Sequence, residues 1–420
     1  SNTSGLSIEV LSKSLPEKFR TRFCGIHFFN PPRYMPLVEL IPHQKTDAKI
    51  LPVLESFLVT NMGKSVILAK DTPNFIANRL GVFSMLVACI HAEKYNIPIE
   101  VVDQLTGKNL GRPKSATFRT ADVVGLDVFA HVAKTMLDNC KDGWEACYSV
   151  PVWMGKLMAS GALGQKTKAG IFKKDKEGIK VIDLETGQYR LADKKADPKV
   201  VEILRLKSWA EKLDALNSSD SKEAKFLLAC FRDIFHYCAV LLGEIADTPR
   251  DMDFALRWGF GWSEGVFEVW QSAGWQKTAK WLACEIEAGH TLGSKPLPHW
   301  VSKLGSGVYV DNKHYNIKKD ALVERVMLPV YNRQLFPDLV INEKPNVSEI
   351  VLYENAGVKL WHTGDDVGIL SFKTKMCTVN NDVLAGINEA IKIAEEKCAG
   401  MVIWQYKVVF SAGANLEEFG

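Results

Sequence analysis

Two side chains near the start of the chain have the types that acid–base chemistry needs, an imidazole and a carboxylate. His27 stands in one apolar run, residues 23–29, and Glu39 lies inside the next, residues 37–41. A carboxylate bonded to one ring nitrogen of a histidine fixes the tautomer and leaves the other nitrogen free to accept a proton. The pair therefore indicates a general base, with a core histidine that has a satisfied partner as the alternative.

The elements that must position this pair are two neighbouring strands. Residues 23–29 and 37–41 are short apolar runs bounded by turn residues, which is typical of buried strands. The Asn-Pro-Pro of residues 30–32 must turn, because proline fixes φ and restricts the residue before it. Paired strands would bring His27 and Glu39 together.

A helix is predicted to follow. Thr72 is a suitable N-cap, Pro73 suits the first helical position, and the apolar periodicity continues to about Ala92. Asn78 would lie in the second turn, from which it could face the strands. An asparagine inside a helix is mildly unfavourable, so Asn78 is a candidate for a polar contact, with a solvent-exposed asparagine as the alternative.

Taken together, these motifs resemble the L-3-hydroxyacyl-CoA dehydrogenase family of fatty-acid β-oxidation. The segments that match in order and spacing are Ser1-Asn2-Thr3-Ser4, His27-Phe28-Phe29-Asn30-Pro31, Leu37-Val38-Glu39 and Asp71 to Leu80. The resemblance implies that His27 is the catalytic base and that Glu39 orients it. It also implies that Ser4 and Asn78 contact the substrate. Asn74 departs from the family pattern, which has glycine there.

The residue types fit the chemistry of that family. Oxidation of a secondary alcohol needs a base for the hydroxyl proton while hydride passes to a nicotinamide. Neutral His27 would take the proton and Glu39 would stabilise the imidazolium. Ser4 and Asn78 would hold the oxygen on which charge changes. The resemblance implies NAD as cofactor and a CoA thioester as substrate. No metal is expected, because the histidines form no ligand-spaced cluster with cysteine or acid.

The glycine-rich loop of a dinucleotide-binding domain, G-x-G-x-x-G, does not occur in the chain. Residues 63–65 resemble the end of a phosphate loop, but Leu58 stands where that motif needs glycine, so they are predicted to close a helix. Residues 258–265 are glycine-rich with the third glycine out of register. The chain is therefore expected to be a fragment that begins inside the NAD-binding domain, and to be inactive by itself.

The composition excludes several classes of protein. The chain is 47% hydrophobic and 24% charged, with a net charge of +3 that is too small to indicate a nucleic-acid partner. Nine cysteines without a C-x-x-C pair indicate reduced thiols in a cytoplasmic protein. The sequence has no apolar run of about eighteen residues, the length that a membrane span needs.

An internal repeat relates two helical segments at an offset of about 150 residues. The same residue types follow the predicted helices of residues 73–95 and 222–245. They are Pro98, Asp103, Gly111, Phe118 and Gly125 in the first copy and Pro249, Asp253, Gly261, Phe267 and Gly274 in the second. A duplicated helical module can bury a shared apolar face. Asn78 maps onto Ala229, so the second copy is predicted to be structural.

The last part of the chain changes character. Strands are predicted over residues 358–363, 367–374 and 400–405, with a helix over residues 382–397. The segment Val409-Phe410-Ser411-Ala412-Gly413-Ala414 then resembles the opening of the crotonase (enoyl-CoA hydratase/isomerase) fold. The resemblance implies that the Ala414 N–H points at a thioester oxygen and that Ala412 contacts the CoA adenine. A plain strand-to-helix turn is the alternative.

The predicted fold class is mixed α and α/β. It comprises the C-terminal part of a Rossmann domain (residues 1–72), a mainly helical dehydrogenase C-terminal domain in two copies (73–160 and 196–345) with a β-hairpin extension between them (161–195), and the start of a crotonase-like ββα domain (346–420). The resemblances imply NAD-dependent oxidation of L-3-hydroxyacyl-CoA to 3-ketoacyl-CoA, in a parent enzyme that also carries enoyl-CoA hydratase and has thiolase as a candidate partner. The alternatives are a stand-alone 3-hydroxyacyl-CoA or 3-hydroxybutyryl-CoA dehydrogenase, and a non-catalytic acyl-CoA-binding or scaffold protein.

Overall fold

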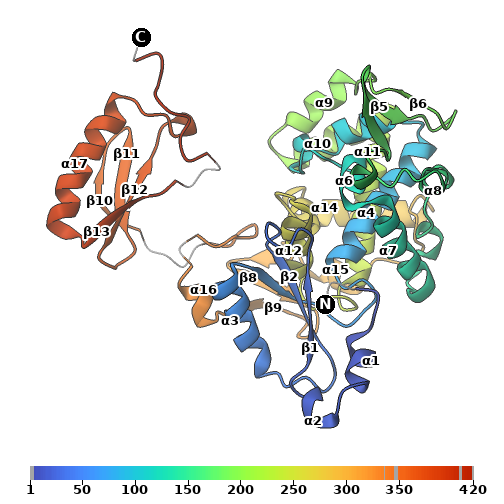
Figure 1. Ribbon diagram of the computed structural model, residues 1–420, viewed down its shortest axis with the longest axis horizontal. Coiled ribbons are helices and arrows are strands. Elements are labelled where there is room, and N and C mark those ends of the chain that lie inside the picture. Colours follow the sequence, from blue (N-terminus) through green and yellow to red (C-terminus); the bar gives the residue numbers. More distant parts are fainter. Residues whose placement is uncertain (1–3, 335, 345–348, 406–408, 419–420) are drawn as a thin grey trace. The chain divides into compact units, whose positions relative to one another are not determined.

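The computed structural model of the chain describes residues 4–334, 336–344, 349–405 and 409–418 (Figure 1). These residues fall into two units, of which the first holds residues 1–333 and 338–344 and the second holds residues 334–337 and 345–420. The individual boundaries of the five-part division predicted from the sequence stay predictions. No described helix is long and apolar enough to cross a bilayer.

A three-stranded sheet carries the first part of the first unit. Its strands are β1 (Cys24–Phe28), β2 (Leu37–Pro42) and β3 (Ser65–Leu68), in that order, with β1 antiparallel to β2 and β2 parallel to β3. The two predicted strands are thus confirmed. The helices α1 (Ile8–Lys13) and α2 (Glu17–Arg20) precede the sheet. The helix α3 (Ile50–Met62) connects β2 to β3 and ends at Gly63, whose φ of 62° is that of a left-handed cap.

The helix α4 (Ala77–Lys94) begins later than the sequence predicts. Thr72 is not its cap, because Asn74 and Phe75 have φ values of 63° and 53° and so lie in the left-handed region, which breaks the helix before Ala77. Asparagine enters this region more readily than most residues with a side chain. Asn74 therefore accommodates the backbone conformation that glycine would otherwise supply.

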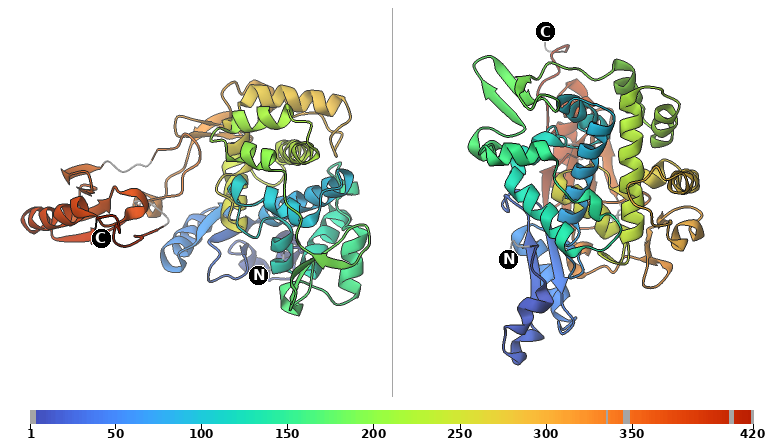
Figure 2. Two further views of the ribbon diagram at one scale, coloured as in Figure 1. Left: turned by 90° about the horizontal axis from the view of Figure 1, so that it is seen from above. Right: turned by 90° about the vertical axis from the view of Figure 1, so that its right-hand side faces the viewer.

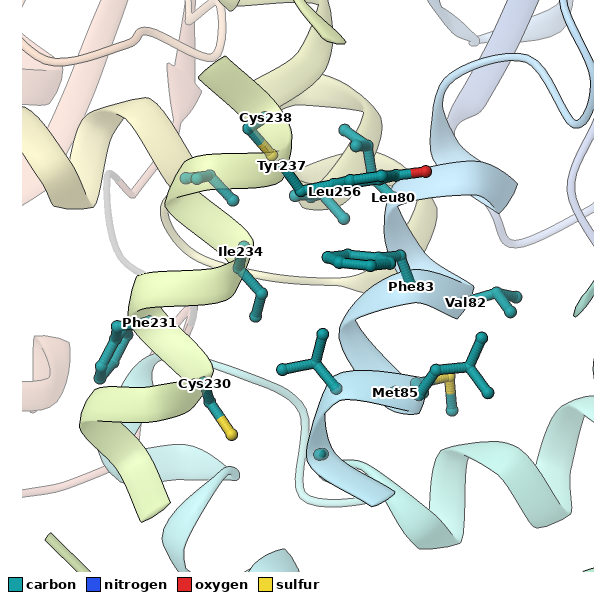
Figure 3. Close-up of a cluster of buried hydrophobic side chains, with 14 of the residues drawn as sticks. Leu80, Val82, Phe83, Met85, Cys230, Phe231, Ile234, Tyr237, Cys238 and Leu256 are labelled. Carbon is teal, nitrogen blue, oxygen red and sulfur yellow. The ribbon is translucent and has the colours of Figure 1, made fainter. Parts of the chain in front are cut away.

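The two long helices of the predicted repeat, α4 and α11 (Lys222–Leu241), pack against each other, as Figure 2 shows from two sides. Figure 3 shows the apolar side chains that both helices contribute to the contact. At its centre the rings of Phe83 and Tyr237 stack with their centroids 3.6 Å apart. Because both faces are buried, the two copies share one core, as the sequence predicts for a duplicated module.

The shorter helices repeat in the same order. They are α5 (Ile99–Leu105), α6 (Phe118–Val124) and α7 (Leu126–Asn139) in the first copy, and α12 (Pro249–Phe260), α13 (Val266–Ser272) and α14 (Trp275–Glu287) in the second. Asp103 accepts backbone N–H bonds from the start of α6, and Asp253 accepts the same kind of bond from the start of α13. Gly125 and Gly274, before α7 and α14, have φ values of 98° and 99°. The two segments thus share these contacts and turns.

Smaller elements complete the first unit. The predicted hairpin is a three-stranded antiparallel sheet of β4 (Phe172–Asp175), β5 (Gly178–Ile182) and β6 (Tyr189–Leu191). The other α-helices and strands described in this unit are the helices α8 (Val152–Ala159), α9 (Pro198–Arg205), α10 (Trp209–Asn217), α15 (His299–Lys303) and α16 (Pro329–Asn332), and the strands β7 (Tyr309–Val310), β8 (Lys313–Asn316) and β9 (Ala321–Glu324).

The second unit is a four-stranded sheet with one long helix. The strands β10 (Ile350–Glu354), β11 (Val358–His362), β12 (Val367–Phe372) and β13 (Gly400–Ile403) lie in that order, and only the last pair is parallel. The helix α17 (Asn381–Lys397) connects β12 to β13 and packs its apolar side chains on the sheet. The predicted strand–helix–strand order is confirmed.

Candidate active site

The strands β1 and β2 bring the predicted acid–base pair together. His27 is the register partner of Glu39 in the antiparallel ladder, and the His27 Nδ1 atom lies 2.7 Å from Glu39 Oε2. The Glu39 side chain is fully buried and His27 is 3% exposed. A carboxylate at Nδ1 favours the tautomer with the proton on that nitrogen, so Nε2 is the atom left to accept a proton.

The second oxygen of Glu39 is held by the start of a helix. Glu39 Oε1 accepts hydrogen bonds from the backbone N–H groups of Ile76, at 3.0 Å, and Ala77, at 2.9 Å. The N-terminus of a helix favours a negative charge. Both oxygens of Glu39 are therefore occupied, which fixes the orientation of the carboxylate. The sequence contains no signal for this contact, because its pattern predicts that the helix begins at Pro73.

Two phenylalanine rings restrain the imidazole. The Phe29 ring lies 4.7 Å from the His27 ring and the Phe75 ring lies 5.5 Å from it, both in edge-on geometry. Edge-to-face contacts of this kind are a favoured arrangement of aromatic rings. Phe29 follows directly after β1, and Phe75 owes its position to the left-handed turn before α4. The histidine is therefore held by packing as well as by its hydrogen bond.

A second polar group forms around Ser4. The Asn78 Nδ2 atom donates to Ser4 Oγ at 2.9 Å, and Ser4 Oγ donates to Asn74 Oδ1 at 3.2 Å. Asn74 Nδ2 in turn donates to the backbone oxygen of Val132 in α7 at 3.0 Å. The predicted polar contact of Asn78 is thus present. The sequence pattern does not predict that Asn74 bonds to Ser4. The signal for this contact is the asparagine itself, which stands where the family has glycine.

The segment of residues 74–78 joins the two groups. Asn74 and Asn78 contact Ser4, whereas Phe75 and the backbone of Ile76 and Ala77 contact the His27–Glu39 pair. The four residues that the sequence predicts for the dehydrogenase site, Ser4, His27, Glu39 and Asn78, therefore lie around one short stretch of chain. This stretch includes the left-handed turn and the first residues of α4.

Residues of the second copy of the repeat contact Arg79, which directly follows this stretch. Arg79 is fully buried and binds Asp142 at 2.7 Å and Glu244 at 2.8 Å, while its Nε donates to the Tyr237 hydroxyl at 3.2 Å. Tyr237 and Glu244 both belong to the second copy. Ala229, the counterpart of Asn78, is 1% exposed and apolar, so it lies in the core.

The two alanines singled out in the second unit differ in their backbone contacts. The Ala412 N–H donates to the Met376 oxygen at 3.1 Å. Ala414 pairs with Val379 in an isolated parallel bridge whose hydrogen bonds are made by Gly413 and Asn415. The Ala414 N–H has no partner among the described residues, and both alanines are exposed. The oxyanion and CoA roles of these residues stay predictions.

Of a nicotinamide dinucleotide, the part that the residues present fit is the reactive nicotinamide end. The proton acceptor is in place, but the sequence holds no G-x-G-x-x-G loop for the pyrophosphate. The first N–H groups of α4, which could otherwise bind a phosphate, are already bonded to Glu39. We therefore derive no pyrophosphate contact from the residues present.

Comparison with known proteins agrees with this geometry. A family model described as 3-hydroxyacyl-CoA dehydrogenase, NAD binding domain, matches residues 1–72, and one described as 3-hydroxyacyl-CoA dehydrogenase, C-terminal domain, matches residues 75–174. The solved structure of 3-hydroxybutyryl-CoA dehydrogenase from Escherichia coli K12 aligns with a TM-score of 0.52 at 19% identity, over 72% of this chain and 74% of that one. The predicted Rossmann-like domain with a helical dehydrogenase domain is thereby confirmed.

Two curated relatives match nearly the whole chain. A probable 3-hydroxyacyl-CoA dehydrogenase of Bacillus subtilis (strain 168) is 35% identical over 422 residues, which cover 99% of this chain and 52% of the relative. A putative fatty acid oxidation complex trifunctional enzyme of Rickettsia felis is 28% identical over 431 residues, which cover 99% of this chain and 53% of the relative. The chain thus spans about half the length of the curated relatives it matches.

Proposed function

We propose that the full-length protein oxidises L-3-hydroxyacyl-CoA to 3-ketoacyl-CoA with NAD, because models of the 3-hydroxyacyl-CoA dehydrogenase family match residues 1–72 and 75–174 of the chain. The observation that carries this proposal is the 2.7 Å contact between His27 Nδ1 and Glu39 Oε2, which leaves Nε2 as the proton acceptor. NAD, when bound, supplies the acceptor for the hydride that leaves the substrate carbon.

His27 removes the hydroxyl proton through Nε2. The buried carboxylate of Glu39 then faces a positively charged imidazolium, which it stabilises at a distance of 2.7 Å. Because Glu39 is also bonded to the start of α4, it does not have to reorient when the charge appears. The rings of Phe29 and Phe75 keep the imidazole in the orientation that this transfer needs.

Asn78 is the direct donor to the substrate oxygen in this proposal, and Ser4 positions it. The Ser4 hydroxyl proton is already used on Asn74, and its oxygen already accepts from Asn78. The Asn78 amide has two hydrogens, of which Ser4 occupies one; the second has no partner among the described residues and can bind a ligand. A donor held in this way can stabilise the oxygen on which charge changes.

A direct assay tests this function. The full-length protein is incubated with NAD and L-3-hydroxybutyryl-CoA, and the formation of NADH is followed, with the D enantiomer as the control substrate. We expect turnover with the L form and at least a hundredfold lower turnover with the D form. Equal rates with both enantiomers, or no turnover of either L-3-hydroxybutyryl-CoA or a longer-chain L-3-hydroxyacyl-CoA, would contradict the proposal.

The second unit supports a second activity for the full-length protein, the hydration of enoyl-CoA. The Ala414 N–H, which has no partner in the described part of the chain, could donate to a thioester oxygen, and the Rickettsia felis relative is named as a trifunctional enzyme of fatty acid oxidation. Ala414→Pro removes this N–H. We expect the variant to lose hydration of crotonyl-CoA while NADH formation from the L-3-hydroxyacyl-CoA is kept. Unchanged hydration would contradict the role of Ala414. Association with thiolase stays a prediction.

A further inference from the structure

A loop of the second copy contacts the chain just before the segment of residues 74–78. This loop, residues 243–247, follows α11. The Lys70 backbone N–H donates to the Ile245 oxygen at 3.1 Å, and the Lys70 ammonium group binds the Asp247 carboxylate at 2.8 Å. Because Lys70 stands between β3 and the left-handed turn before α4, the 243–247 loop fixes the point from which the segment starts.

The same loop also contacts the residue directly after the segment. The Arg79 guanidinium binds Glu244 at 2.8 Å, in addition to the buried Asp142 at 2.7 Å and the Tyr237 hydroxyl at 3.2 Å. Arg79 is adjacent in the sequence to Asn78, the donor proposed for the substrate oxygen. The segment is therefore held at both ends by one loop of the second copy.

The 243–247 loop is itself held in place by the second copy. Ala246 is fully buried, and its backbone oxygen accepts from the Gly243 N–H at 2.8 Å. The Ile317 N–H donates to the Asp247 oxygen at 3.0 Å, which fixes the far end of the loop. A loop whose backbone is buried and bonded in this way can act as a fixed support for its neighbours.

The two copies of the repeat differ at this loop. The long helix of the first copy, α4, runs to Lys94, whereas α11 ends at Leu241. At the spacing that relates Pro98 to Pro249, the counterpart of Leu241 is Ile90, so α11 ends about one helical turn earlier than α4. The residues that continue the helix in the first copy thus form, in the second copy, the loop that contacts the site segment.

A shift of the segment would move several groups of the candidate site together. Asn78 would move relative to Ser4, and the N–H groups of Ile76 and Ala77 would move relative to the carboxylate of Glu39. A misplacement of about 1 Å in an active site can lower the rate by about 10²-fold, even when its cause lies away from the reacting atoms. The contacts that hold the segment are therefore expected to affect the rate of the reaction.

We propose that Glu244 and Asp247 are positioning residues for the dehydrogenase reaction, although they belong to the second copy. Through Arg79 and Lys70 they set where Asn78 and the start of α4 lie, and neither of them has to touch the substrate. The Glu244 side chain is 46% exposed, and an ion pair with an exposed partner contributes little to stability. This role rests on the proposed function, and it gives the second copy a part in the reaction besides its part in the shared core.

The steady-state rate of NADH formation from L-3-hydroxyacyl-CoA by the full-length protein tests this role. Glu244→Ala should lower kcat about tenfold, and the double variant that adds Asp247→Ala should lower it about 10²-fold. The KM for the substrate should stay within about twofold, because no contact to the substrate is lost. Glu244→Gln keeps an acceptor for Arg79, so its kcat should stay within about threefold of the wild type.

The matched control is Glu285→Ala. Arg232 binds the buried Asp233 and the half-buried Glu285, each at 3.0 Å, which is the arrangement that Arg79 has with its two carboxylates. Asp233 contacts His91 in the last turn of α4, so this ion pair lies near the opposite end of that helix from the site segment. Glu285→Ala removes the same kind of contact and should leave kcat unchanged.

Hydrogen exchange in the same full-length proteins tests the support of the segment without a substrate. The amides of Ile76 and Ala77 report on the segment, because they are bonded to Glu39. Their exchange should be faster in Glu244→Ala and in the double variant than in the wild type, and it should be unchanged in Glu285→Ala.

The outcomes separate the positioning role from the proposed function. A loss of kcat together with faster exchange, and neither change in Glu285→Ala, supports the positioning role. A kcat within twofold of the wild type in the double variant, an equal loss in Glu244→Gln or Glu285→Ala, or unchanged exchange would overturn it while the activity of the wild type stands. No NADH formation by the wild type would reject the proposed function itself.

Discussion

Replacing Glu39 by glutamine should abolish the base without unfolding the site. A glutamine side chain has one oxygen and one NH₂ group, so it must choose which of them faces His27 Nδ1 and which faces the start of α4. The N–H groups of Ile76 and Ala77 need an acceptor at 3.0 and 2.9 Å. The amide oxygen therefore turns to the helix, and the NH₂ group turns to the histidine.

The size of the effect follows from this orientation. The opposite orientation would leave two buried N–H groups without an acceptor, at a cost of roughly 1–3 kcal/mol each. An NH₂ group at Nδ1 forces the ring proton onto Nε2, so Nε2 can no longer accept a proton from the substrate. A wrong histidine tautomer in the Ser-His-Asp triad lowers kcat by about 10⁴-fold. We expect a loss of about 10³- to 10⁴-fold for Glu39→Gln in the full-length protein.

The assay is the steady-state rate of NADH formation, combined with thermal unfolding of the same variants. Glu39→Gln keeps an acceptor for α4 and should change the unfolding temperature little, whereas Glu39→Ala removes that acceptor and should lower both stability and rate. A kcat of Glu39→Gln within tenfold of the wild type would refute the reasoning. It would show that the tautomer of His27 is not set by residue 39.

Three further predictions concern the second copy and the buried charges. Asn78→Ala should lower kcat by about 10²-fold, because it removes a donor to the reacting oxygen. Ala229→Asn, at the matching position of the second copy, should change only thermal stability. Equal losses of kcat at both positions would show that this part of the second copy is not merely structural. Arg79→Met should lower the free energy of unfolding by about 3–5 kcal/mol, because Asp142 loses its buried partner. A loss below 1 kcal/mol in urea denaturation would contradict this prediction. Burial, with nearby arginines, lowers the pKa of His314 to about 4, so the folded state should lose up to about 3 kcal/mol as the pH falls from 6.5 to 4. His314→Gln should flatten this part of the stability–pH curve, and an unchanged curve would rule out His314 as its source.

The contact between His27 and Glu39 could be predicted because its determinants are local. Residues 23–29 and 37–41 are apolar runs separated by a proline turn, and such a pattern predicts two neighbouring strands. His27 and Glu39 then meet because the strands pair in the observed register. The repeat was recognisable for the same reason, since its aspartates and glycines define caps and turns that each copy needs.

The contacts that fix the site depend on tertiary structure and could not be predicted in this way. The sequence pattern predicts too early a start for α4, because Thr72 and Pro73 are typical of a helix start, whereas Asn74 takes a left-handed conformation. Once the helix begins at Ala77, its first N–H groups reach Glu39. The bond between Arg79 and Glu244 joins residues 165 positions apart, and no local pattern indicates it.

In the proposed function, His27 removes the proton in a dehydrogenation carried out by the full-length protein. The most direct measurement is kcat for NADH formation from L-3-hydroxyacyl-CoA in wild type and in His27→Ala, with the unfolding temperature as a check on folding. Loss of a positioned base predicts a decrease of about 10²- to 10⁴-fold in a protein that still folds. A kcat for His27→Ala within twofold of wild type would contradict the account and would leave His27 as a core residue.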